Sequence, residues 1–334
     1  MELTNILAAA QALGASDVHL APGRPPVLRV HGLLQEVGRE PLTADLVRQV
    51  AENLVPARLR EDLEREGQVD FAFEDPRGGR CRASVFRARG ELGVALRLIP
   101  GSPPHPDALG VPEAVQDLVR RPHGMVIVTG PTGSGKTTTL ASLVQEINRE
   151  RAVHVITLED PVEYVYPPGR ALVRQREIGT DSLSFALGLR AALREDPDVI
   201  LVGEMRDAET ASTALQAAET GHLVFTTLHT ADAPGVVDRI VDLFPPHEQQ
   251  QVLAQLAAVL EGVVAQRLLR RRDGQGRVAA FEVLVATPGV RSLIREGKPH
   301  QLVTAMQTGG ASGMQTMQDA LRRCAPFAEV EAQA

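Results

Sequence analysis

Residues 130–137 are the part of this chain whose residue types and spacing predict a definite chemistry. Their sequence, GPTGSGKT, fits the phosphate-loop pattern: a glycine, four further residues, then Gly-Lys-Thr. The glycines let backbone N–H groups turn inward around a phosphate chain, and the start of a following helix adds the positive end of its dipole. We therefore expect ATP and Mg²⁺ as cofactors. The residues expected to bind the nucleotide are Gly130, Pro131, Thr132, Gly133, Ser134, Gly135, Lys136, Thr137 and Thr138.

The pattern assigns two of these side chains specific partners. Lys136 would reach the β- and γ-phosphates, and the hydroxyl of Thr137 would bind Mg²⁺. The motif also requires a strand before it and a helix after it. An apolar run at 125–128 predicts the buried strand, and residues 138–148 predict the helix. An ordinary glycine-rich loop is the alternative, and it would not require this context.

Further along the chain, helical patterns alternate with short apolar runs at 153–158, 199–202 and 223–226. This alternation predicts a mainly parallel sheet flanked by helices. In such sheets, ligands bind beyond the carboxyl ends of the strands. The polar residues that follow each run are therefore the candidates for the site.

Two acidic residues flank the apolar run at 199–202. Asp198 precedes it and Glu204 follows it. Because a strand advances about 3.3 Å per residue, six positions separate the two by roughly 20 Å. We therefore expect Glu204 to hold Mg²⁺ or its water shell and Asp198 to be structural. A helix-capping or solvated glutamate is the alternative for Glu204.

Three carboxylates, Glu159, Asp160 and Glu163, follow the run at 153–158. One of them could polarise an attacking water, as phosphoryl transfer to water requires. The residue types do not choose among the three, and an acidic surface turn is the alternative.

Histidines lie at both ends of the run at 223–226. His229 falls beyond its carboxyl end, where a polar group could sense the γ-phosphate, whereas His222 precedes the strand. We expect His222 to contact a neighbouring element or subunit. A purely structural histidine is the alternative for each.

Arginines are plentiful, and one supplied by a neighbouring subunit can stabilise transition-state charge. A surface ion pair is the alternative for every one of them. The basic run at 270–272 is expected to be a solvated hairpin flank, with contact to an anionic partner as its alternative. The candidates for phosphate contact are Arg80, Arg82, Arg87, Arg97, Arg190, Arg194, Arg206 and Arg239.

The composition and the positions of the prolines indicate two domains. The 334 residues are 43% hydrophobic and 23% charged, as in a soluble globular protein. Residues 1–99 alternate short strand and helix patterns and predict a small α+β domain. Four prolines within residues 100–106 mark a linker, which we place at 100–112. The second domain would span 113–334.

Several finer expectations concern single elements of the chain. Residues 248–269 predict one long helix, and residues 270–284 a hairpin turning at Asp273-Gly274, a favoured type I′ pair. The part beyond about residue 289 predicts helices with a glycine-rich break at Gly309-Gly310.

Several classes of protein are disfavoured. The two cysteines, Cys81 and Cys324, are too few for a cysteine-rich zinc site. A net charge of −7 argues against a protein that coats nucleic acid. No basic leader is evident at the start, and no apolar run approaches the roughly 18 residues of a membrane span. We therefore expect a cytoplasmic protein with no transmembrane segment and no direct nucleic-acid partner.

Four motifs in order identify a resemblance. The loop at 130–137, an acidic stretch at 156–164, the segment 193–207 and the histidine-containing segment 220–230 resemble the Walker A, acidic, Walker B and His boxes of the type II/type IV secretion ATPase superfamily. Within that superfamily the chain is similar to the PilT family of pilus retraction ATPases. Residues 15–30 match that family's start.

The segment 290–298 resembles the C-terminal A-I-R-N-L-I-R-E motif of the PilT family. Here Gly289, Val290 and Ser292 replace Ala, Ile and Asn. These departures leave the retraction-specific role of this helix open. The resemblance covers nearly the whole chain.

The resemblance implies a PAS-like α+β N-terminal domain, a RecA-like P-loop NTPase domain and a homohexameric ring with ATP bound between domains. It implies Glu163 as the catalytic base, beside Lys136, and Glu204 as the Walker B glutamate. His222 and His229 would be the His-box residues. Arg80 and Arg82 would reach the nucleotide from the N-terminal domain.

The implied function is a cytoplasmic motor, peripheral at the inner face of the cytoplasmic membrane. It would act on an inner-membrane platform protein of the PilC kind, with a paralogous PilU-like or PilT-like ATPase as a further partner. Pilus retraction and twitching motility would result. Three alternatives stay open: a PilU-like accessory ATPase, a DNA-handling motor on the same core, and a non-hydrolysing structural ring subunit.

Overall fold

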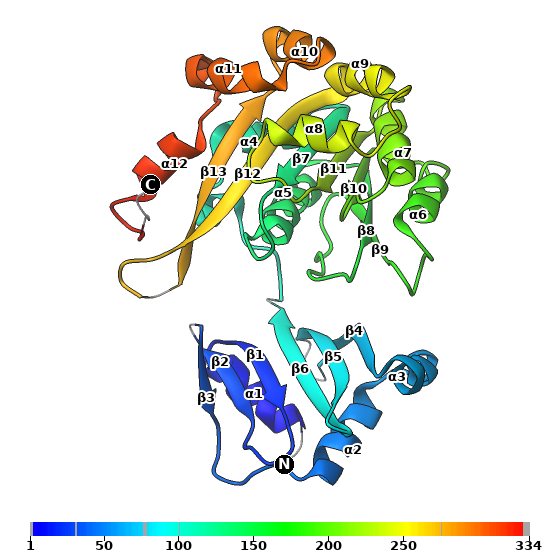
Figure 1. The fold of residues 1–334 in the computed structure, drawn as a ribbon, viewed down its shortest axis with the longest axis vertical. Helices are drawn as coiled ribbons and strands as arrows, with labels where there is room; N and C mark the ends of the chain where they lie inside the picture. The colour runs from blue at the N-terminus through cyan, green and yellow to red at the C-terminus, as the bar shows by residue number, and fades with distance from the viewer. Residues whose placement is uncertain (1–2, 31, 76–78, 100, 275, 330–334) are drawn as a thin grey trace. The chain divides into compact units, whose positions relative to one another are not determined.

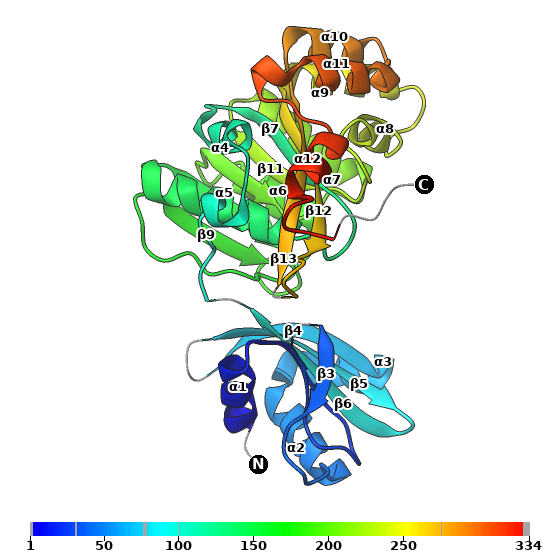
Figure 2. The ribbon, with the colours of Figure 1, turned by 90° about the vertical axis from the view of Figure 1, so that its left-hand side faces the viewer.

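The computed structural model describes residues 3–30, 32–75, 79–99, 101–274 and 276–329. The chain forms two compact units, drawn in Figures 1 and 2. Unit 1 comprises Met1–Ser102 together with the short segment Glu163–Val165, and unit 2 comprises Pro103–Val162 and Tyr166–Ala334. The division between residues 102 and 103 falls within the proline-rich stretch.

Unit 1 is a six-stranded antiparallel sheet in the order β3-β2-β1-β6-β5-β4. Its helices α1 and α2 pack against β1 and β6 around one core that includes Leu7, Val18, Val47 and Val85, so they cover the same face of the sheet (Figure 2). The elements are α1 (Leu3–Ala12), β1 (Ala15–Leu20), β2 (Val27–Val30), β3 (Leu33–Glu36), α2 (Ala44–Leu54), α3 (Arg60–Glu66), β4 (Gln68–Glu74), β5 (Arg80–Ala88) and β6 (Glu91–Ile99).

Local signals explain these elements. The Thr43 hydroxyl caps α2 by accepting from the Leu46 backbone N–H, and Gly67, at φ 76°, ends α3 in the left-handed conformation that glycine adopts freely. Strand β3 escaped the sequence analysis because all four of its residues are exposed, so it lacks the alternation of a half-buried strand.

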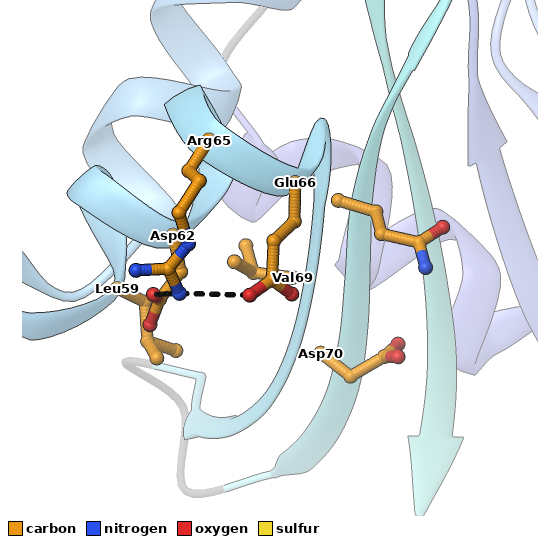
Figure 3. A pocket seen from close by; sticks show the side chains of 7 residues that line it. Leu59, Asp62, Arg65, Glu66, Val69 and Asp70 are labelled. Atoms are coloured by element: carbon orange, nitrogen blue, oxygen red, sulfur yellow. Dashed lines mark hydrogen bonds and ion pairs between the residues drawn. The ribbon is translucent and has the colours of Figure 1, made fainter.

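A surface hollow lies between α3 and β4 of unit 1 (Figure 3). Arg65 pairs with Asp62 and Glu66 at its edge. Its lining is mostly charged and holds none of the residues of the phosphate-loop motif. The lining residues are Leu59, Asp62, Arg65, Glu66, Gln68, Val69 and Asp70.

Unit 2 is built on a seven-stranded sheet in the order β13-β12-β7-β11-β10-β8-β9, parallel except for β13. Its strands are β7 (Gly124–Thr129), β8 (His154–Glu159), β9 (Leu172–Glu177), β10 (Val199–Val202), β11 (Leu223–Thr227), β12 (Leu260–Arg270) and β13 (Arg277–Val285). Its helices are α4 (Glu113–Gln116), α5 (Lys136–Glu150), α6 (Phe185–Ala192), α7 (Ala208–Glu219), α8 (Gly235–Val241), α9 (Gln249–Val259), α10 (Pro288–Arg295), α11 (Leu302–Thr308) and α12 (Met317–Cys324).

Both faces of this sheet are covered by helices. Met125 and Ile127 of β7 belong to the core beneath α7, whereas Val126 and Val128 belong to the core beneath α5. Burial on both faces explains why β7 reads as a continuous apolar run. The predicted combination of a small α+β domain and a P-loop α/β domain is confirmed.

The prediction of one long helix at 248–269 is wrong. Helix α9 ends at Val259, and Leu260 begins β12, which pairs with both β7 and β13. An apolar run buried on both sides has no period that separates strand from helix. The β-branched Val263 and Val264 favour the strand, and Gly262 makes room for Leu118, which would lie 2.8 Å from a Cβ there.

The hairpin of β12 and β13 is present, but its turn differs from the prediction. Gly274 has a φ of 71°, whereas Asp273 does not adopt a positive φ, so the pair does not form a type I′ turn. In the basic run beside it, Arg271 pairs with Asp273 at 3.0 Å and the Arg272 Nε donates to the Ala328 carbonyl at 3.0 Å. These two arginines therefore have partners within the chain.

Arg291 of α10 points inward and ties three elements together. Its guanidinium donates to the carbonyls of Ala257 and Ala258 at the end of α9, to the Ala286 carbonyl, and to Glu261 at 2.6 Å. It thereby satisfies carbonyls that the end of α9 leaves without helical partners.

We expect Arg291→Ala to lower the free energy of unfolding by about 2 kcal/mol, because it leaves these carbonyls and the mostly buried Glu261 with fewer partners. Thermal melting of the purified protein measures the effect. Arg295→Ala, one turn further along the same helix and exposed, is the control and is expected to melt like the wild type. Equal melting temperatures of both variants would contradict a stabilising role for the Arg291 hydrogen bonds.

Among the helices in the described ranges, none combines the length and apolar character that a membrane crossing needs.

Candidate nucleotide site

The phosphate loop joins the end of β7 to the start of α5, in the strand–loop–helix context that the motif requires. Gly130, Gly133 and Gly135 have φ values of 143°, 78° and 90°, which disfavour any other residue. A Cβ at Gly130 would also lie 2.4 Å from the Gln266 carbonyl oxygen. The loop therefore has the glycine-dependent backbone that lets amides face a phosphate chain.

Lys136 is the first residue of α5, and it is buried, with 9% of its surface exposed. Its Nζ donates to the carbonyls of Gly130 at 2.8 Å and Pro131 at 3.2 Å, and lies 3.4 Å from the His229 Nδ1. Burial lowers the pKa of Lys136, and the charge of Glu204 opposes that shift. A bound polyphosphate would supply the negative charge that a buried ammonium requires.

Glu204 follows β10, and its two carboxylate oxygens contact two different side chains. Its Oε1 lies 3.0 Å from the His229 Nε2, and its Oε2 lies 2.8 Å from the Arg206 guanidinium. Burial raises the pKa of Glu204, but the hydrogen bond from Arg206 and the charges of His229, Arg206 and Lys136 outweigh it, so the pKa lies below its usual range. Lys136, His229, Glu204 and Arg206 thus form one connected network, which we call the Lys136–Arg206 network.

The two ends of β10 carry different roles. Asp198 lies at the amino end and accepts a hydrogen bond from the His154 backbone N–H at 2.8 Å, so it joins two strands. Glu204 lies at the carboxyl end with the phosphate loop. The two residues therefore lie at opposite ends of β10, as predicted.

The residues present fit Mg²⁺ only together with phosphates. Within the described ranges, no group of three or more His, Cys, Asp or Glu side chains could hold a metal alone. Mg²⁺ commonly takes one or two protein oxygens and completes its shell with phosphates and waters. The exposed Thr137 hydroxyl and the Glu204 carboxylate provide such oxygens. Because His229 and Arg206 already engage the Glu204 carboxylate, a contact through water suits it best.

The three carboxylates that the sequence left open have different surroundings. Glu159 is 7% exposed and accepts hydrogen bonds from the Thr157 hydroxyl at 2.6 Å and the Gln175 amide at 3.0 Å. Its contacts therefore lie within the sheet. The charge of Asp160 adds to the rise in the Arg206 pKa that the hydrogen bond to Glu204 causes. Glu163 belongs to unit 1, whereas the residues of the Lys136–Arg206 network belong to unit 2.

Glu163 lies among cationic groups of unit 1. Burial raises the pKa of Glu163, and the charges of Arg82 and Arg97 oppose that shift. Arg97 also pairs with Asp17 at 3.1 Å, and Arg80 lies 3.8 Å from Glu74. These arginines remain predictions for nucleotide contact.

The two histidines lie beyond opposite ends of β11, as predicted. His222 precedes β11, where its Nδ1 lies 2.9 Å from the Ala217 carbonyl oxygen and its backbone N–H donates to the same oxygen. It therefore ties the end of α7 to the strand. His229 lies in the network beside Lys136.

Of the unit 2 arginines, Arg206 is the one that the described contacts connect to Glu204. Arg190 pairs with Glu209, and Arg194 donates to the Arg190 carbonyl at 3.0 Å. Arg239 is exposed in the last turn of α8, and Arg87 is exposed on β5 of unit 1. The nucleotide roles proposed for these four are therefore not supported by contacts within either unit.

Gln266, a buried residue of β12, packs beneath the phosphate loop and was not predicted from the sequence. Its Oε1 accepts from the Thr139 hydroxyl of α5 at 2.8 Å, and its Nε2 would lie 2.9 Å from a Cβ at Gly135. A glutamine within the mostly apolar stretch 260–269, which also holds Glu261 and Arg267, was the available signal. The incorrect helix assignment there concealed it.

Comparison with known proteins agrees with this geometry. A family described as "Type II/IV secretion system protein" matches residues 2–330. The chain belongs to this family. It is 44% identical to the type IV pilus retraction ATPase PilT of Pseudomonas aeruginosa over 96% of this chain and 93% of the relative. It is also 46% identical to a twitching motility protein of Neisseria gonorrhoeae, over 89% of this chain and 79% of that protein.

The fold of this chain is also similar to that of a solved structure. The crystal structure of the pilus retraction motor PilT with bound ADP has a TM-score of 0.91 and 46% sequence identity. The match covers 99% of this chain and 95% of that chain.

Proposed function

We propose that this chain hydrolyses ATP and, as a homohexameric ring, drives retraction of type IV pili. The observation that carries the proposal is the Lys136–Arg206 network, which places a buried ammonium, a histidine and an acidic residue at a phosphate loop. The relatives named as a pilus retraction ATPase and a twitching motility protein support the cellular role.

Each part of the site has a distinct task. Loop amides of residues 130–137 and the Lys136 ammonium would hold the phosphates. Thr137 and Glu204 would hold Mg²⁺, which would supply positive charge to neutralise the phosphates. Glu163 takes a proton from the attacking water. His229 senses the state of the γ-phosphate because it touches both Lys136 and Glu204.

The remaining parts of the proposal concern the assembly. The ring works at the inner face of the cytoplasmic membrane, where it passes its motion to a PilC-like platform protein that removes pilin subunits from the fibre. A paralogous ATPase of the PilU or PilT kind is a further partner. Arg80, Arg82 and Arg97 of unit 1 are proposed to contact nucleotide in the assembled ring.

Mg-ATP hydrolysis by the purified chain, measured with its mass in solution, tests the activity. We expect turnover by a particle of about six times 35.9 kDa. Expression in a strain that cannot retract its pili should restore twitching. A hexamer without turnover would overturn the independent motor and favour an accessory, PilU-like or structural ring. Turnover stimulated by DNA, without restored twitching, would favour the DNA-handling alternative.

A further inference from the structure

Glu282 of β13 is a buried carboxylate with no place in the chemistry proposed above. It is 7% exposed, and each of its two oxygens accepts a backbone hydrogen bond from a different segment. Its Oε1 accepts from the Ala233 N–H at 2.6 Å, and its Oε2 accepts from the Met317 N–H at 3.0 Å. One side chain thus joins the loop before α8 to the first residue of α12.

The loop that Glu282 holds is the one that carries His229. It runs from the end of β11 to the start of α8 and begins with the Leu228 N–H, which donates to the Val128 carbonyl at 3.1 Å. Two further points fix this loop. The Thr230 N–H donates to the Thr129 hydroxyl at 2.8 Å, which ties it to the strand before the phosphate loop. The second point is Ala233. Between them, the Thr230 hydroxyl donates to the Asp232 carbonyl at 2.9 Å, so the loop is internally braced.

The other partner of Glu282 is equally fixed to β13. Gln315 and Val283 exchange two backbone hydrogen bonds of 2.9 and 3.1 Å, and the Gln315 amide donates to the Phe281 carbonyl at 2.6 Å. Helix α12 begins at Met317 and packs on the same strand. A shift of α12 along β13 would therefore act on the Glu282 carboxylate directly.

We propose that Glu282 is a positioning residue that keeps His229 against Lys136 and Glu204 by anchoring the loop at Ala233, and that it links this loop to α12. The inference rests on the proposed function, because it assigns His229 a part in hydrolysis. It adds a path from the C-terminal helix to the nucleotide site. A shift of this loop would disturb His229, because its Nε2 contacts Glu204 while its Nδ1 contacts Lys136.

Two backbone N–H groups point at the Glu282 carboxylate, one at each oxygen. Burial raises the pKa of Glu282, the two backbone donors oppose the shift, the charge of Asp232 adds to it and that of Arg267 opposes it. The Ala233 and Met317 N–H groups face different oxygens, so an amide in place of the carboxylate would set its NH₂ donor against one of them. Glu282→Gln therefore removes one anchor with little change in volume.

The first measurement is the kinetics of Glu282→Gln in the full-length protein. We expect kcat to fall about tenfold with KM for ATP within about twofold, since the phosphate loop is untouched. In a His229→Ala background, Glu282→Gln should lower kcat no further, because the two residues act through one contact. Independent, multiplying losses in the double variant would overturn the proposal.

Glu261→Gln is the matched control. Glu261 is also a largely buried carboxylate of this sheet, with Arg291 and Arg121 as partners. Glu261→Gln is expected to lower the melting temperature while kcat stays within about twofold of wild type. An equal fall in kcat for both variants would show a general loss of structure and overturn a specific role for Glu282.

Hydrogen exchange measured by mass spectrometry provides a readout that needs no turnover. Amides of residues 228–236 should exchange faster in Glu282→Gln than in the wild type or in Glu261→Gln. Unchanged exchange in this loop would overturn the anchoring role even if kcat fell. Faster exchange in a protein whose wild type has no turnover would keep the anchor and reject the proposed hydrolysis instead.

Discussion

Lys136→Ala is expected to reduce Mg-ATP hydrolysis by about 10³-fold, the scale of losing a charged group that stabilises transferring phosphate. The Lys136 ammonium is buried among the Gly130 and Pro131 carbonyls, so water cannot readily replace it. The same change should abolish the rise in melting temperature that ATP produces in the wild type. At a ligand concentration of 100 times Kd, that rise corresponds to about 2.7 kcal/mol.

Lys298→Ala is the matched control for this prediction. Lys298 is exposed and pairs with Glu296 at 2.8 Å, outside the phosphate loop. Its loss should leave both turnover and the ATP-dependent rise in melting temperature as in the wild type. Substantial hydrolysis by Lys136→Ala would show that phosphates bind elsewhere and would remove the basis of the proposed site.

Glu163→Gln is expected to lower kcat by about 10²-fold while nucleotide binding persists, because an amide cannot take a proton from water. The pH profile gives a second readout. A base works in its ionised form, and burial raises the pKa of Glu163 against the opposing charges of Arg82 and Arg97. The acid limb of the kcat profile should therefore lie above the usual carboxylate range and should disappear in the variant.

Glu159→Gln distinguishes the carboxylates that the sequence could not rank. Glu159 accepts hydrogen bonds from Thr157 and Gln175 within the sheet, so its replacement should cost stability and lower kcat much less than Glu163→Gln does. If Glu159→Gln abolished turnover and Glu163→Gln did not, the assignment of the base would be wrong. Kinetics and melting of both variants, measured side by side, settle the order.

Much of the site could be predicted because its signals are local in sequence. The phosphate loop is a single stretch whose glycines, lysine and threonine act through their own backbone and side chains. The placement of Asp198 and Glu204 at opposite ends of β10 followed from the length of one strand, and the role predicted for Glu204 followed from the rule that ligands bind at carboxyl ends. The difference between His222 and His229 followed from the same argument on β11.

Other features could not be predicted because they depend on contacts between distant segments. From Val252 to Leu269 apolar residues continue with only scattered polar ones between them, so no local period marks where α9 ends and β12 begins; pairing with β7 and β13 decides it. Strands β3 and β9 lie at sheet edges and carry polar residues, so they lack the usual pattern. The choice among arginines likewise needed the positions of their acidic partners.

The sequence by itself thus determined the phosphate chemistry and the alternating strands and helices, since these depend on residues close together in the chain. Only the tertiary structure decided which side chains support that chemistry. Gln266 acts on a loop more than a hundred residues earlier in the chain, and Glu282 joins segments centred on Ala233 and Met317. A buried polar group is defined by partners that folding brings to it, and sequence spacing carries no record of those partners.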